Sequence, residues 1–506
     1  MEKQASYLIK FSLPFDFWRR LFFYLVFMAS LMPNIYSQII EEKKIELTFW
    51  QRDYINLYDV GLAVIDDDKI VFYDESLTQL GEIKNDFIYS IKDSRSYYYD
   101  SALKKIICFS SDYDGEYVTL INPNKAKSEK FLIKFNGRKN DLLQKLVLFD
   151  KSVYGVLIKK DQTILGKIDL DQGEISPLKL SIEWERRKIL KISKVNSKSF
   201  AVLFLDENEP KNAKTNIALF DNLGLVITNK LITNTDNDFH ILDFTITDAG
   251  NDNFNISGIY YKKVEIKKIS LLLENTEPSG MFIAQIEDYK LDDIKYFSHY
   301  SVLQKFNERN DPNWKHYKDD KTYNNEKYYQ FNTLMHPLID NNGQYILISE
   351  IYYPVQYSLN PGHNSALDGQ HKVESSYYNW SFAIVLILDE KLKILNTFKI
   401  PMNFKNNPKQ LSHRLKVVID EDELNFYYIN GDTLVKNSIF DDELREKKRV
   451  IYKGVKNSSD HSSSHYYSAN WYDDYFYTIK NEYIDPQGKG SSNEYIDYYL
   501  IKYKLK

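Results

Sequence analysis

Residues 146–174, LVLFDKSVYGVLIKKDQTILGKIDLDQGE, hold three short apolar runs separated by polar turns. The runs cover residues 146–149, 153–158 and 164–168, and the last of them leads into an Asp- and Gly-containing turn at 169–174. Apolar runs of about four to eight residues, bounded by Asp, Asn and Gly, are typical of strands joined by tight turns. This stretch therefore predicts consecutive antiparallel β-strands.

The same pattern recurs along most of the chain. Runs at 61–65 and 70–73 flank an acidic turn, runs at 106–109 and 117–121 flank another, and runs at 200–205, 217–220 and 225–228 follow one another closely. The strand–helix alternation of a parallel α/β sheet is absent from the sequence pattern. The repeated hairpins indicate an all-β sandwich, barrel or propeller.

The hairpins group into units of regular length. Candidate units begin near Leu57, Leu103, Leu142, Lys188, His240, Tyr329, His413 and Tyr466. The shortest spacing, about 40 residues, matches a four-stranded propeller blade. We therefore expect an all-β fold, a β-propeller of about seven or eight blades, whose terminal strand at 495–505 completes a blade with N-terminal strands. The alternative is a smaller N-terminal propeller followed by a separate C-terminal β domain.

Two insertions interrupt this rhythm within a single predicted domain at 38–506. The first, at about 288–328, contains a predicted helix over 291–310, because Ile294, Phe297, Tyr300 and Leu303 recur at helical spacing. The second, at about 354–381, follows an apolar strand and carries Pro, Gly, His and Tyr. A loop of that length is often functional.

Residues 1–37 have the features of a secretory signal peptide. Arg19 and Arg20 precede the apolar run 21–32, and small or polar residues follow up to a predicted cleavage site after Ser37. The run is shorter than the roughly 20 residues of a membrane span, and we expect no transmembrane span after the signal. An uncleaved anchor or an interfacial helix is the alternative. The prediction is an exported protein, periplasmic or extracellular.

The amino-acid composition further limits the class of protein. The chain has 506 residues with 66 Lys and Arg against 71 Asp and Glu, which argues against a basic nucleic-acid-binding protein. Cys108 is the sole cysteine and lies in an apolar run, so we expect a small buried hydrophobic side chain rather than a reactive thiol. The 41 Tyr and 29 Phe suit strands, and most should serve the core.

Several strings together resemble a group of exported, uncharacterised propeller-like proteins of Bacteroidota. They are residues 248–261 (DAGNDNFNISGIYY), 280–286 (GMFIAQI) and 348–353 (ISEIYY), within a matching region at about 240–400, and the signal that ends in Ser37 and Gln38. The resemblance implies a propeller-like fold and a location outside the cytoplasm. It implies no catalytic residues.

Motifs for catalysis or metal binding do not emerge from the sequence. It contains no G-x-S-x-G, H-E-x-x-H or phosphate-loop pattern. All nine His lie at or after position 240, but their spacing favours exposed loop residues over a metal site. We therefore predict no catalytic residues, no metal and no cofactor. Carboxylate pairs for glycoside hydrolysis would have to converge from different blades, which sequence alone cannot reveal.

Aromatic residues gather around the second insertion and provide the candidate binding site. Exposed aromatic rings with polar edges are effective anchors for proteins or sugars. The candidate binding residues are Tyr352, Tyr353, His363, His371, Tyr377, Tyr378 and Trp380.

The function that fits these features is a secreted or periplasmic β-propeller acting as a non-catalytic binding or scaffold module of the cell envelope. Its expected partner is an envelope protein or a glycan, and not a nucleic acid. A propeller-type glycan-active hydrolase is the alternative, and a structural component of an envelope assembly is a third possibility.

Overall fold

The computed structural model describes residues 39–504 with internal gaps. These gaps are 46–52, 67, 85–96, 112–115, 134–141, 160–161, 173, 179–186, 207–213, 234–238, 263–278, 305, 307–331, 342, 357–375, 407–412, 421–422, 431–432, 441–442, 451–465, 472–474 and 485–494. The predicted signal peptide and the candidate residues His363 and His371 lie outside the described residues.

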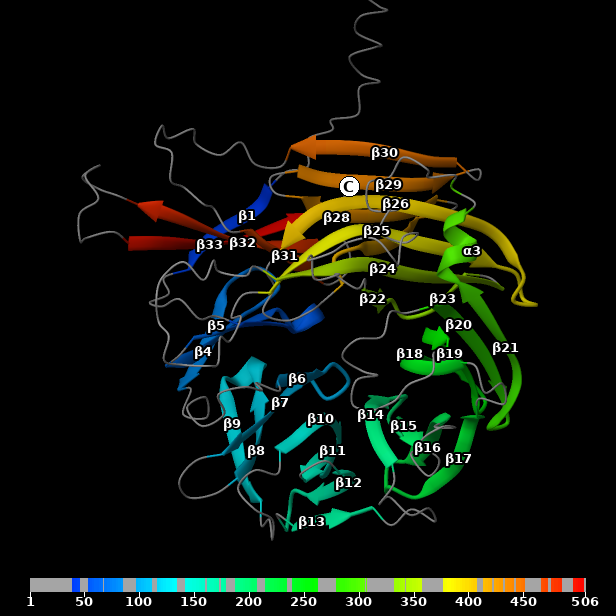
Figure 1. Cartoon of the computed structure of the whole chain (residues 1–506). Helices are drawn as coiled ribbons and strands as arrows, with labels where there is room; N and C mark the ends of the chain where they lie inside the picture. The colour runs from blue at the N-terminus through cyan, green and yellow to red at the C-terminus, as the bar shows by residue number, and fades with distance from the viewer. Residues whose placement is uncertain are drawn as a thin grey trace, which may run out of the picture.

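The described strands form eight antiparallel sheets, which are the blades of a propeller (Figure 1). Blade 1 contains β2 (Asp53–Asn56), β3 (Leu62–Ile65), β4 (Lys69–Tyr73) and β5 (Gln79–Lys84). Blade 2 contains β6 (Tyr97–Asp100), β7 (Lys105–Ser111), β8 (Glu116–Asn122) and β9 (Lys127–Ile133). Blade 3 contains β10 (Leu142–Phe149), β11 (Ser152–Lys159), β12 (Gln162–Asp169) and β13 (Glu174–Pro177). Blade 4 contains β14 (Arg187–Lys194), β15 (Ser199–Asp206), β16 (Lys214–Asp221) and β17 (Val226–Thr233).

The second half of the ring has the same organisation. Blade 5 contains β18 (Phe239–Gly250), β19 (Asn253–Lys262), β20 (Gly280–Glu287) and β21 (Lys290–Ser298). Blade 6 contains β22 (Asn332–Met335), β23 (Ile339–Asn341), β24 (Gln344–Gln356), β25 (Ser376–Leu388) and β26 (Ile394–Asn406). Blade 7 contains β27 (Lys416–Asp420), β28 (Glu423–Asn430), β29 (Thr433–Phe440) and β30 (Glu443–Val450). Blade 8 contains β31 (Tyr466–Asn470), β32 (Tyr475–Ile484), β33 (Tyr495–Lys504) and β1 (Ile39–Ile45). The short helices are η1 (Tyr58–Val60), η2 (Pro123–Lys125) and α3 (His299–Gln304).

The eight sheets confirm the propeller prediction. Each predicted unit begins within six residues of the first strand of a blade, and the hairpins expected at 146–174 are β10 to β12. The first strands of neighbouring blades contact one another from β2 round to β22, so these strands form the inner wall of the ring (Figure 1).

The two ends of the described chain close the ring. The N-terminal strand β1 pairs antiparallel with β33, with Glu42 opposite Ile501, and becomes the outermost strand of blade 8. This is the closure that the terminal strand at 495–505 predicts. The sheet order β1-β33-β32-β31 therefore joins both ends of the described chain in one blade.

Hydrophobic packing joins each blade to the next. Among the described residues there are eight buried clusters, and each holds side chains from two neighbouring blades, including the pair that spans the closure. Ten of the eleven largest fully buried side chains are Phe or Tyr, and the remaining one is Trp380. Cys108 is buried, as predicted. Among the described residues, Phe and Tyr therefore supply most of the largest side chains buried between blades.

Strand direction gives the ring two distinct faces. We call the end at which the first strands begin the loop face, and the opposite end the turn face. Every connection at the turn face has five residues or fewer, whereas the loop face carries all the longer ones, including residues 263–279, 299–331 and 357–375. The strand β1 begins at the turn face.

The predicted helix at 291–310 is wrong over its first part, where residues 290–298 form the strand β21. Ile294 and Tyr296 pack toward blade 4, whereas Phe297 packs toward blade 6. Since both faces of β21 are covered, its apolar residues fall at spacings that resemble those of a helix. The helix α3 starts at His299.

The second predicted insertion is also shorter than expected. The strand β24 continues to Gln356, and β25 begins at Ser376, so that Pro354 pairs with Tyr378. The apolar run at 345–353 thus marks only part of a 13-residue strand. The connection itself is 357–375.

A buried amide in blade 7 gives a stability prediction. Asn437 is fully buried on the side of β29 that packs on blade 6, and among the described residues neither its Oδ1 nor its Nδ2 has a hydrogen-bond partner. We expect Asn437→Leu to raise the free energy of unfolding by about 1–3 kcal/mol, because the desolvated amide is removed. Denaturant unfolding measures this change.

Asn425 in the same blade is the matched control. It is also buried, but its Oδ1 accepts a hydrogen bond from the Ser438 hydroxyl at 2.6 Å. Asn425→Leu should therefore destabilise the protein. If both substitutions lower stability equally, the amide of Asn437 is satisfied in solution.

Candidate functional site

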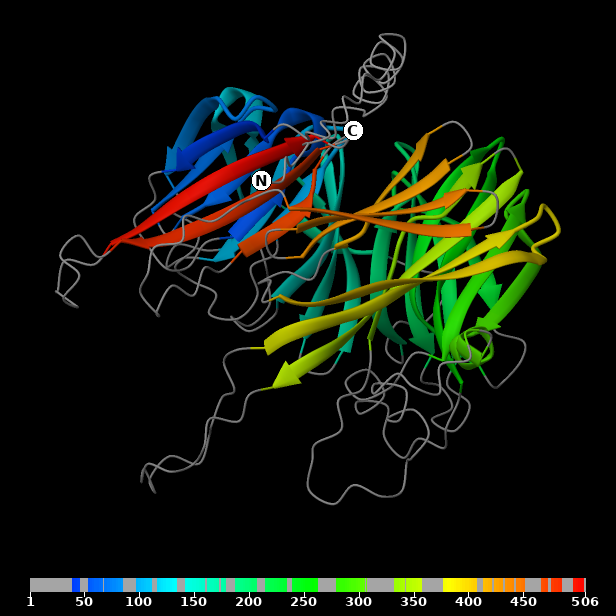
Figure 2. The ribbon, with the colours of Figure 1, turned by 90° about the horizontal axis from the view of Figure 1, so that it is seen from above.

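Blade 6 carries the longest strands of the ring and extends beyond its inner strand. The strands β24, β25 and β26 each have 13 residues. The pairing of β24 with β25 continues past Tyr352, which lies opposite the first residue of β22, to Gln356 opposite Ser376. Figure 2 shows these strands projecting at the lower left, on the loop face. We call residues 353–356 and 376–379 the tongue.

The sequence-predicted binding residues divide into two groups. The backbone of Tyr353, Tyr377 and Tyr378 lies in the paired strands of the tongue. Tyr352 and Trp380 lie at its base, where they are 7% and 0% exposed and their rings stack at 5.5 Å. These two side chains therefore belong to the core between blades 6 and 7 and are not the exposed anchors that the sequence predicts.

Beneath the tongue, a buried carboxylate connects blade 6 to the start of blade 7. Glu350 lies on β24 and is fully buried. Its oxygens accept hydrogen bonds from His336 Nε2 at 2.6 Å and Trp380 Nε1 at 3.0 Å. They also accept the backbone N–H groups of Arg414 and Leu415 at 3.0–3.1 Å. These four residues come from two blades, so the carboxylate anchors the segment that leads into β27.

The environment of Glu350 keeps it ionised. Burial by itself would raise its pKa, but the hydrogen bond and charge of His336, the nearby His413 and the backbone of Arg414 hold the pKa below its usual value. A carboxylate can only accept, so His336 Nε2 carries the hydrogen of this bond.

A second imidazole stacks on the first. The ring centroids of His336 and His413 are 4.1 Å apart, and His413 Nε2 donates to the Met335 carbonyl at 2.9 Å. Burial and the neighbouring His336 lower the pKa of His413 to about 4, so it is neutral at pH 7.

The Arg414 guanidinium lies over the Trp380 ring at 5.1 Å. We call Glu350, His336 and His413 the Glu–His cluster.

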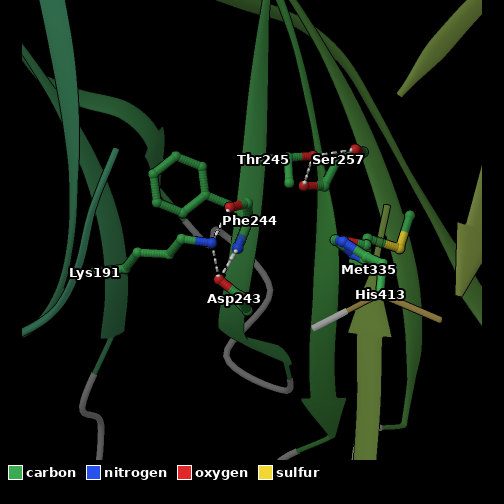
Figure 3. Close-up of polar contacts among 7 residues, drawn as sticks. All are labelled: Lys191, Asp243, Phe244, Thr245, Ser257, Met335 and His413. Carbon is green, nitrogen blue, oxygen red and sulfur yellow. Dashed lines mark hydrogen bonds and ion pairs between the residues drawn. The ribbon is translucent and has the colours of Figure 1, made fainter. Parts of the chain in front are cut away.

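The inner wall next to this cluster carries an ion pair between blades 4 and 5. Lys191 on β14 donates to Asp243 on β18 at 2.5 Å and to the Phe244 carbonyl at 2.8 Å (Figure 3). Both charged side chains are about one third exposed. The charge of Lys191 also acts on His413. Blades 4 to 7 thus contribute charged or titratable groups to one region of the inner wall.

The inner strands β14 and β18 contain β-bulges next to Lys191 and Asp243. The register of β14 shifts between Ile189 and Lys191, and that of β18 shifts between Ile241 and Asp243. Lys191 and Asp243 are thus the first paired residues after equivalent bulges. A bulge turns side chains to a new direction and is common near functional sites. The inner strand of blade 6 is interrupted at an equivalent place, where His336 lies between β22 and β23.

A second ion pair ties three blades near the turn face. Lys194 on β14 donates to Asp100 on β6 at 2.6 Å and to the Leu148 carbonyl on β10 at 2.9 Å. Its side chain is 13% exposed, and that of Asp100 is 2% exposed. This contact braces the inner wall of blades 2 to 4.

The two carboxylates differ in how fully the protein engages them. Glu350 accepts hydrogen bonds from two side chains and two backbone groups, whereas the Lys191 ammonium and the Phe244 N–H both donate to Oδ1 of the partly exposed Asp243. Among the residues that the structure describes, no group of three or more His, Cys, Asp or Glu could hold a metal ion.

Sequence reasoning missed the Glu–His cluster. One signal was present: Glu350 is the lone acidic residue within the apolar strand at 345–353. An unpaired charge in such a strand is costly, so a partner is implied. The identity of that partner depends on contacts between residues far apart in the sequence.

Comparisons with known proteins add fold-level likeness only. No family model matches the sequence, and no curated protein is a significant match. Among solved structures, the tricorn protease has 12% identity and a TM-score of 0.36, over 79% of this chain and 35% of that one. Polysaccharide lyase Uly1 has 8% identity and a TM-score of 0.37, over 86% and 92%. Dipeptidyl peptidase 4 of Porphyromonas gingivalis has 10% identity and a TM-score of 0.36, over 85% and 64%.

The class of fold therefore rests on the chain's own strand order, which is that of an eight-bladed β-propeller. This chain spans about a third of the length of the tricorn protease chain. Within the described residues, none of the helices has the length and apolar character needed to cross a membrane.

Proposed function

We propose that this protein is an exported, non-catalytic binding or scaffold propeller of the cell envelope, and that its loop face holds the partner. The observation that carries the proposal is the asymmetry of the ring: all connections longer than five residues lie on the loop face. Binding residues are concentrated on loops that a rigid scaffold positions. The closed ring with its eight inter-blade cores is such a scaffold.

The position of β1 supports this arrangement. It begins at the turn face, directly after the predicted cleavage site at Ser37. Ile39, the first residue of β1, lies at the face opposite the long connections. If the predicted signal is retained as an anchor, the loop face would point away from the membrane.

The tongue is the part of the loop face that we assign to binding. Tyr353, Tyr377 and Tyr378 would supply aromatic anchors, and His363 and His371 in the connection between their strands would supply polar contacts. Tyr352 and Trp380 would hold the base of the tongue in place from the core. The expected partner is an envelope protein or a glycan.

Replacing residues 357–375 with an Asn-Gly turn tests the proposal. The replacement joins Gln356 to Ser376, which are paired neighbours, and leaves every described strand intact. We expect the melting temperature to change by less than about 4 °C, since loop length alone costs little. Capture of envelope proteins or of arrayed glycans should be lost.

A second replacement provides the control. Residues 207–213 also join two strands at the loop face, in blade 4, away from the tongue. An Asn-Gly turn there should leave binding in place. Binding that survives removal of 357–375 would contradict the assignment to the tongue, and release of sugars from an arrayed glycan would favour the hydrolase instead.

A further inference from the structure

We propose that the Glu–His cluster is an acid-sensitive joint that releases the start of β27 from blade 6 when the His413 ring gains a second proton. This inference is independent of the proposed function. It rests on the placement of two stacked imidazoles between a buried carboxylate and the backbone of the next blade.

The neutral-pH state of the joint is defined by its hydrogen bonds. Glu350 holds the N–H groups of Arg414 and Leu415, the two residues that precede β27. His336 donates to the same carboxylate, and His413 donates through Nε2 to the Met335 carbonyl on blade 6. Hydrogen bonds thereby hold three consecutive residues, 413–415, against blade 6.

A proton added to His413 Nδ1 meets an unfavourable set of charges. His336 lies in ring contact at 4.1 Å, Arg414 is the next residue in the chain, and Lys191 projects from blade 4. The negative groups are Glu350, already engaged by four donors, and Asp243, which pairs with Lys191. Burial and the charges of His336 and Lys191 therefore disfavour the His413 imidazolium, and Glu350 favours it.

The direction of the pH dependence follows from this geometry. Docking lowers the pKa of His413 from 6.5 to about 4, so a released His413 gains a proton as pH falls below 6.5 while the docked one does not. The docked state loses stability from pH 6.5 down to about 4. The lowered pKa of Glu350 acts in the same direction below its ordinary value of 4.5, as the carboxylate becomes protonated.

Hydrogen exchange measured by mass spectrometry on the full chain tests the joint. After correction for intrinsic rates, we expect the amide exchange rate of residues 413–420 to increase about twentyfold from pH 7 to pH 5. This factor is the change in the ratio of released to docked protein that follows from lowering the His413 pKa from 6.5 to about 4. Residues 116–122 in blade 2 should keep their protection. Equal loss of protection in both segments would overturn the proposal, because it would show global unfolding.

Two variants locate the effect. H413Q keeps an N–H donor for the Met335 carbonyl but cannot be protonated, so the pH dependence of residues 413–420 should disappear. H240Q removes another buried histidine, on blade 5, and should leave that dependence unchanged. If H413Q retains the increase at pH 5, the joint is not the Glu–His cluster. If H413Q fails to fold, the comparison of the two segments in the unsubstituted chain still decides.

Discussion

Glu350→Gln is expected to lower the free energy of unfolding by about 3–5 kcal/mol, the range for removing one member of a buried charge pair. The substitution removes the negative charge that His336 faces and directs an amide N–H₂ toward N–H donors. Glu350 is fully buried and accepts from Trp380 and from the backbone of Arg414 and Leu415, so no water replaces the lost acceptor. Guanidinium unfolding followed by circular dichroism measures the loss.

Glu423→Gln provides the matched control on the neighbouring blade. Glu423 pairs with Lys436 at 3.2 Å, but about one third of its side chain is exposed. The expected loss is below about 1 kcal/mol, because water screens and replaces such a pair. Equal losses for the two substitutions would show that Glu350 does not hold blades 6 and 7 together.

Deletion of residues 39–45 is expected to have the largest effect on stability. It removes β1, leaves the outer edge of β33 without its partner strand, and removes the strand pairing that joins the two ends of the described chain. An exposed edge of this kind promotes association between chains. We expect a loss above about 5 kcal/mol, the lower limit of typical total stability, together with higher oligomers in light scattering.

A peptide added in trans distinguishes loss of the strand from a general defect. A synthetic peptide with the sequence of residues 39–45 should restore part of the melting temperature of the deleted protein, because a free edge accepts an extended segment. The same peptide with Lys43 replaced by Pro should not, since Pro lacks the N–H group. A monomeric deleted protein with unchanged stability would contradict closure by β1.

The repeating part of the fold could be predicted from the sequence because it depends on local patterns. Runs such as 146–149, 153–158 and 164–168 match β10, β11 and β12, and the spacing of the units gives the blade starts. Closure was also predictable, since a strand at the very end of the chain needs a partner. These features depend on period-two alternation and turn chemistry, which act over a few residues.

The errors come from positions where tertiary contacts change the pattern. The outer strand β21 packs on both faces, so its apolar residues resemble a helix. The polar stretch before Phe382 was read as loop, yet Ser376 to Trp380 pair with β24. Trp380 looked like a surface anchor and is a core residue that binds Glu350. Contacts of this kind depend on register over tens of residues, which the sequence does not display.

Site-specific photo-crosslinking from the two faces of the ring tests the central claim most directly. A photo-reactive amino acid would replace Lys188, Asn332 or Thr433 at the loop-face ends of β14, β22 and β29, and Lys125, Lys198 or Lys391 at the turn face. We predict crosslinks to a cell-envelope partner from the loop-face positions, and none from the turn face. Crosslinks from the turn face alone, or equally from both faces, would contradict a loop face that holds the partner.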